Sequence, residues 1–145
     1  TLMYGFVIET DSNKSLRKFG DKIIIGLCEE EIISKYNTFG KKIFLETQSP
    51  LPKDRNYTPA SMTTSEEKDI YSNINILIKR IKETKSFAIK VTRKGDHKYT
   101  STGLARNVAG AVFDNWPNIK VDLKKPKLEV VIQIINNRSL IYIRD

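Results

Sequence analysis

The sequence predicts an α/β protein of two small units, and three observations support that prediction. Short apolar, β-prone runs recur along the chain. Between them, two longer stretches carry apolar residues at helical spacing, from Ser65 to Ile81 and from Ser101 to Asn115. Residues 49–64 contain three of the five prolines and few apolar side chains, which is typical of a linker or of an ordered loop on the surface. We therefore expect a first unit at 1–48, a linker at 49–64 and a second unit at 65–145.

The first unit is predicted to be a small β-α-β arrangement. Its apolar run Lys22–Cys28 fits either a strand or part of a helix, and Cys28 is expected to be a buried small hydrophobe. Glu29–Tyr36 is predicted to be helical, because acidic residues at a helix start suit the helix dipole. The other expected elements are a strand at Tyr4–Thr10, a turn at 11–14, a break at Asn37–Gly40 and a strand at Lys42–Thr47.

The second unit is predicted to alternate helices and strands. A Ser or Thr cap followed by acids opens its first helix. In the second helix, the small pair Ala109-Gly110 should allow close approach of another backbone. Asn136-Asn137 suits a tight hairpin, because Asn tolerates positive φ. The expected strands are Phe87–Val91, Val121–Leu123, Leu128–Ile135 and Leu140–Ile143, with turns at 93–98 and 124–127.

Charge is distributed unevenly. The formal net charge is +8, but residues 1–75 hold ten Lys/Arg and eleven Asp/Glu, whereas residues 76–145 hold fifteen and six. A basic half of this kind indicates a polyanion partner, most often nucleic acid. The alternative is a soluble basic protein without such a partner.

The residue types that catalysis needs are poorly represented. His97 is the only histidine and Cys28 the only cysteine, and the sequence has no glycine-rich phosphate loop or metal-ligand cluster. No catalytic residue, metal site or cofactor is therefore expected. No apolar run is long enough to cross a bilayer, and the start does not resemble a signal peptide, so we expect a cytoplasmic protein without a membrane partner.

Anion binding is better supported, at the connection between Val91 and the helix that follows. Arg93, Lys94 and Lys98 lie beside a helix start, whose free N–H groups and positive dipole end attract phosphate. Ser101 would add a hydroxyl, and Arg106 lies about one turn into the helix. The alternative is that Ser101 or Thr102 only caps its own helix.

A second basic cluster surrounds Pro126, where a solvated turn explains the lysines equally well. Its lysines would attract a phosphate backbone over a long range, without sequence specificity. The aromatic residues Tyr99 and Trp116 would stack on bases or belong to the core.

Several of these features occur together in one known family. A strand ends in a basic R-x-G-x-H turn, a Ser-led helix contains a small-residue pair, and a V-D-L-x-x-P turn precedes a strand rich in Val and Ile. From Glu66 to Asp145 the chain resembles a THUMP domain. The matching segments are Arg93–His97, Ser101 with Ala109-Gly110, Val121–Leu123 with Pro126, and Val130–Ile135.

The resemblance implies a THUMP-type α/β domain with a mixed sheet, preceded by a small ferredoxin-like β-α-β unit. It also implies a tRNA-binding module that contacts the tRNA acceptor end or backbone and presents tRNA to a modifying enzyme. The adapter of tRNA cytidine acetylation looks most similar overall. The alternatives are the N-terminal part of a larger 4-thiouridine synthetase or tRNA methyltransferase, or a module that binds an acidic protein. The candidate RNA-binding residues are Lys90, Arg93, Lys94, His97, Lys98, Ser101, Arg106, Lys124, Lys125 and Lys127.

Overall fold

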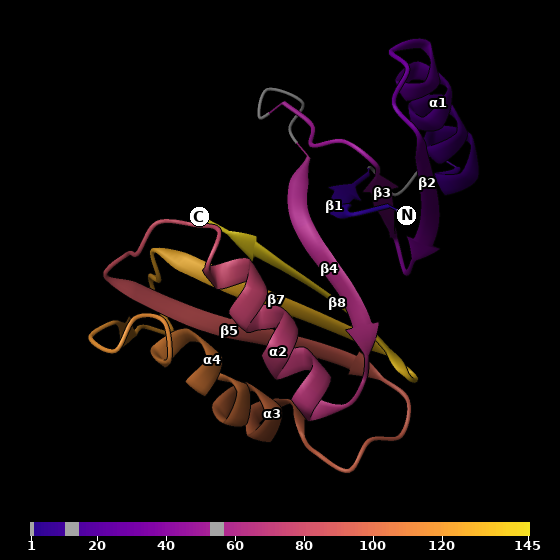
Figure 1. Ribbon diagram of the computed structural model, residues 1–145. Helices are drawn as coiled ribbons and strands as arrows, with labels where there is room; N and C mark the ends of the chain where they lie inside the picture. The colour runs from indigo at the N-terminus through magenta and orange to yellow at the C-terminus, as the bar shows by residue number, and fades with distance from the viewer. Residues whose placement is uncertain (1, 11–14, 53–56) are drawn as a thin grey trace. The chain divides into compact units, whose positions relative to one another are not determined.

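The computed structural model describes residues 2–10, 15–52 and 57–145 (Figure 1). The chain forms two compact units, residues 1–60 and 61–145, and each is described separately. The turn predicted at 11–14 and the middle of the predicted linker lie outside the described residues.

The first unit contains an antiparallel sheet and one helix. Its strands lie in the order β2-β3-β1, and the start of β4 pairs with β1. Apolar residues of β1, β3 and the helix α1 form its core. The bounds are β1 Tyr4–Glu9, α1 Leu16–Glu29, β2 Ser34–Phe39, β3 Lys42–Thr47 and β4 Thr58–Thr64.

The helix predicted at Glu29–Tyr36 is wrong. The helix starts earlier, at Leu16, and it includes the run Lys22–Cys28. Ser15 caps it, since the Ser15 hydroxyl accepts a hydrogen bond from the Lys18 N–H. Glu31 has a φ of 63°, a left-handed conformation that ends helical winding. The residues that follow alternate between partly buried and exposed and pair with β3 across the turn at Gly40. Cys28 is exposed, which also contradicts the prediction.

The predicted linker contains a strand in its last seven residues. Pro59 lies opposite Phe6 in the pairing of β4 with β1, and Ala60 is buried. Proline lacks a backbone donor but has a φ compatible with extended structure at a sheet position that needs no N–H. The linker predicted at 49–64 is therefore a strand over residues 58–64.

The second unit is a mixed sheet covered by helices, which confirms the predicted fold class. Its strands lie in the order β4-β8-β7-β5-β6, where β7 pairs antiparallel with β8 and parallel with β5. The helices of this unit lie on one face of its sheet (Figure 1). Helices and sheet share one apolar core. The bounds are α2 Glu67–Ile78, β5 Ser86–Lys94, α3 Ser101–Val108, α4 Gly110–Phe113, β6 Lys120–Val121, β7 Leu128–Ile135 and β8 Arg138–Arg144.

The helix predicted at 101–115 is divided at Ala109. Gly110 faces the ring of Tyr71 on α2, since a Cβ built at Gly110 would lie 2.9 Å from the Tyr71 hydroxyl oxygen. The small pair therefore admits an aromatic ring rather than a second backbone. The Tyr71 hydroxyl donates a hydrogen bond to the Asp114 carboxylate, and this bond, together with burial, raises the pKa of Tyr71. Trp116 is buried in the core and is not a base-stacking surface.

Candidate nucleic-acid interface

The basic loop lies where β5 ends. β5 is longer than predicted, so Arg93 and Lys94 are strand residues and the loop is residues 95–100. Parallel pairing of β5 with β7 continues to Lys94 and Ile135, which places the loop beside the β7–β8 turn. There the Asn136 N–H donates to the Lys94 carbonyl at 2.8 Å. The predicted hairpin turn thus supports the basic loop.

His97 connects the loop to this turn. The Arg93 guanidinium can only donate, so its Nη1 donates to His97 Nδ1 at 3.2 Å. In the tautomer that fits this contact, the His97 Nε2–H donates to the Asn136 carbonyl at 2.7 Å. Because both ring nitrogens have protein partners, His97 holds the Arg93 side chain in position.

Tyr99 fixes the other side of the loop. Its ring stacks on His97, with centroids 5.4 Å apart and planes 7° from parallel. Its hydroxyl donates to the Ser65 carbonyl at 2.6 Å, and burial raises the pKa of Tyr99. The Ser65 N–H in turn donates to the Asn137 carbonyl at 3.0 Å. The His97 ring thereby covers one face of the Tyr99 ring. The segments around Ser65, Tyr99 and Asn137, which are far apart in the sequence, meet at the loop.

The start of α3 follows this anchored loop. Thr100 caps the helix, since its hydroxyl accepts from the Gly103 N–H at 2.9 Å, so the cap lies one residue before the predicted position. The N–H groups of Ser101 and Thr102 precede the first hydrogen bond of the helix and point outward. With Lys94 and Lys98 both exposed, cations and helix donors occur at the same end of the unit.

Two further candidates lie away from the loop. Arg106 is exposed in the last turn of α3, about 7.5 Å along the helix axis from Ser101 at 1.5 Å per residue. Lys90 lies in the middle of β5 and forms an ion pair with Glu129 at 2.6 Å, although 61% of its side chain is exposed. Neither residue belongs to the cluster formed by the loop and the helix start.

The lysines around Pro126 lie at the opposite end of β5. The Lys127 N–H donates to the Ser86 hydroxyl at 3.0 Å, and Ser86 is the first residue of that strand. Eight strand steps separate Ser86 from Lys94, which is about 26 Å at 3.3 Å per residue. The candidate residues Lys124, Lys125 and Lys127 therefore form a group separate from the basic loop.

Asp122 folds the loop that carries these lysines. Its carboxylate accepts the N–H groups of Lys124 and Lys125, each at 3.0 Å. The Lys125 bond, followed by the Lys124 bond, lowers the pKa of Asp122. The turn is thus held by the ionised carboxylate.

We expect this turn to loosen only in acid. The pKa of Asp122 is lower in the folded protein than its ordinary value of 3.8. The stability that the ionised carboxylate adds to the turn is therefore complete above pH 3.8, and it is lost as the pH falls through the lower, folded-state pKa. In an NMR titration, the amide protons of Lys124 and Lys125 should shift with a midpoint below 3.8. Asp122→Asn should abolish that transition, and unchanged amide titrations in this variant would contradict the assignment.

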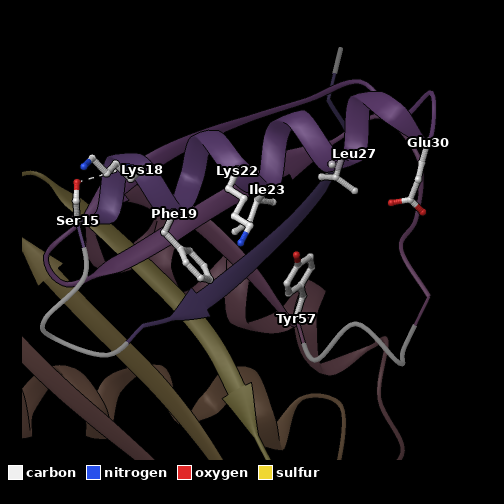
Figure 2. Close-up of a pocket in the computed structure, with 9 residues that line it drawn as sticks. Ser15, Lys18, Phe19, Lys22, Ile23, Leu27, Glu30 and Tyr57 are labelled. Atoms are coloured by element: carbon white, nitrogen blue, oxygen red, sulfur yellow. Dashed lines mark hydrogen bonds between the residues drawn. The ribbon is translucent and has the colours of Figure 1, made fainter.

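The first unit has a groove that the sequence did not reveal (Figure 2). Phe19 and Tyr57 point into it, with Lys22 between them and Lys18 at one end. The helix that lines this groove was indicated in the sequence by apolar residues at helical spacing after Ser15, which are Leu16, Phe19, Ile23 and Leu27. Within the ranges that the structure describes, no cluster suited to a metal ion is found, and no helix is long and apolar enough to span a membrane.

Comparison with known proteins gives a family match over residues 64–144, by the model of the THUMP domain. This chain belongs to the THUMP domain family. The resemblance drawn from the sequence is thereby confirmed. A tRNA sulfurtransferase of Vibrio campbellii is 28% identical over 109 residues, covering 74% of this chain and 22% of the relative. The chain thus spans about a fifth of the length of this curated relative.

Solved structures share the fold of this THUMP protein. A 4-thiouridine synthetase in complex with RNA and bound ATP superposes with a TM-score of 0.76 at 11% identity, covering 99% of this chain and 41% of that one. PH1313 from Pyrococcus horikoshii superposes with a TM-score of 0.72 at 21% identity, covering 98% and 54%. At these identities the likeness establishes the fold.

Proposed function

We propose that this THUMP protein is a tRNA-binding module that presents tRNA to a catalytic centre of tRNA modification. The observation that carries the proposal is the anchored basic loop at the end of β5. Family membership and the sulfurtransferase relative support tRNA as the anion. In this proposal, residues 65–145 form the RNA-binding domain. The protein acts in the cytoplasm, as expected for tRNA modification.

The loop suits a phosphate for reasons of geometry and charge. Lys94 and Lys98 supply exposed positive charges, and Arg93 is held by His97 before any ligand arrives. The N–H groups at the α3 start add fixed donors and a positive dipole end. A guanidinium that is already positioned loses less conformational entropy on binding. These contacts hold the backbone and do not select bases.

A second candidate function is the RNA-binding part of a tRNA sulfurtransferase. The relative named above favours this class over the adapter of tRNA cytidine acetylation. Sequencing the gene beyond Asp145 distinguishes the two, since a sulfurtransferase requires further coding sequence. Loss of 4-thiouridine, rather than acetylcytidine, from the tRNA of a deletion strain would give independent support.

The proposal predicts salt-sensitive binding of tRNA. Filter binding of a tRNA transcript between about 50 and 200 mM salt should show affinity falling by about 10-fold or more, because each phosphate contact releases counterions. Absence of binding at 50 mM salt would refute the proposal. A pull-down with and without RNase tests the acidic-protein alternative, whose partner would remain bound after the treatment.

A further inference from the structure

The positive charge of the second unit is concentrated away from the basic loop. We define the lysine end as the two connections 79–85 and 120–127. Its eight cations are all exposed, and two acids, Glu83 and Asp122, accompany them. The cations are Lys79, Arg80, Lys82, Lys85, Lys120, Lys124, Lys125 and Lys127.

Hydrogen bonds hold the two connections of the lysine end against the start of β5. The Lys120 N–H donates to the Lys85 carbonyl at 3.2 Å, and the Asp122 N–H donates to the Phe87 carbonyl at 2.9 Å. Lys85 and Lys120 also line one shallow groove. Among the residues that the structure describes, no side chain of the lysine end forms a salt bridge. The backbones at Lys85 and Lys120 are therefore held together, and the charged side chains of the lysine end face solvent.

The other end of the unit is nearly balanced. Around the basic loop, the cations Arg93, Lys94, Lys98, Arg138 and Lys68 are accompanied by four acids, three of them at the start of α2. Hydrogen bonding of Tyr99 to Ser65 places that helix start beside the loop. Six of the seven net positive charges of residues 61–145 thus belong to the lysine end.

We infer that the lysine end is a second contact for the phosphate backbone of the tRNA, about 26 Å from the basic loop along β5. This inference rests on the proposed function. Long-range attraction and part of the affinity arise at the lysine end, because six net charges act on the polyanion there. The basic loop, with its fixed Arg93 and helix donors, sets the position of the bound RNA. Only an RNA long enough to reach both ends gains both contributions.

The test compares two variants of equal charge in the full chain. Lys85→Gln/Lys124→Gln/Lys125→Gln alters the lysine end, and Lys18→Gln/Lys35→Gln/Lys41→Gln removes the same charge from the first unit. We expect the first variant to bind a tRNA transcript about 10-fold more weakly and to lower the salt slope by about two to three, while the second changes affinity less than about 2-fold. Equal behaviour of the two variants would overturn the inference.

Lysine acetylation of the wild-type protein gives a readout that does not depend on substitutions. With tRNA bound, mass spectrometry should show Lys85, Lys124 and Lys125 protected, and Lys41 modified at its usual rate. Protection of Lys94 and Lys98 without protection at the lysine end would refute this inference and leave the proposed function intact. If the wild type binds no tRNA, the proposed function fails as well.

Discussion

Arg93→Ala/Lys94→Ala should weaken tRNA binding by about 10- to 100-fold and lower the salt slope by about two, since two charged contacts at the loop are lost. Both residues lie at the end of β5, where Lys94 is exposed and Arg93 half-buried, and their backbones remain in the ladder with β7. The fold should therefore persist. Filter binding over a salt series measures both effects.

The matched control for this variant is Lys90→Ala/Arg106→Ala, which removes the same charge from the same unit. Lys90 is paired with Glu129, and Arg106 lies in the last turn of α3. We expect a loss of less than about 5-fold, because neither belongs to the loop cluster. Equal losses in the two variants would mean that total charge, rather than the loop, determines affinity.

Gly95→Ala should destabilise the second unit and loosen the loop. Gly95 has a φ of 107°, and its added Cβ would lie 2.6 Å from Asn136 Oδ1 and 3.1 Å from Asn136 Cα. Such a backbone conformation costs a residue with a side chain about 1–3 kcal/mol. For a unit of this size, the melting temperature should fall by about 4–8 °C per kcal/mol. Thermal unfolding measures the shift, and tRNA affinity should fall with it.

Gly26→Ala is a control that should raise the stability of the protein, whereas Gly95→Ala should lower it. Gly26 is inside α1, and nothing lies within 4 Å of a Cβ built there. Alanine should stabilise the helix by up to about 1 kcal/mol, because it loses less backbone entropy than glycine. If both substitutions lower the melting temperature alike, positive φ at Gly95 is not the cause.

Much of the second unit could be predicted because its local patterns agree with its tertiary structure. Leu128–Ile135 is β-prone and forms β7, and Asn136 adopts the positive φ, 53°, expected of the hairpin. In the first unit, local patterns conflicted. The acids at Glu29–Glu31 resemble a helix start, but the spacing from Leu16 to Leu27 had already defined the helix. Pro59 obscured β4 because proline usually interrupts strands.

Only the part of the candidate site that is formed by residues close together in the sequence could be predicted. Arg93, Lys94 and Lys98 are close along the chain, so their convergence followed from the strand and loop. The role of His97 depends on Asn136, 39 residues further on, and only the β5–β7 register brings the two together. The lysine end likewise joins two segments whose contact the sequence does not reveal.

The link between His97 and Asn136 also bears on the order in which the loop is completed during synthesis. Translation delivers Arg93 well before the hairpin that supports it, and contacts between distant residues form late in folding. A nascent chain that ends within β7 has the cations but no carbonyl to hold the imidazole. The fixed placement of Arg93 should therefore arise only when the β7–β8 turn closes.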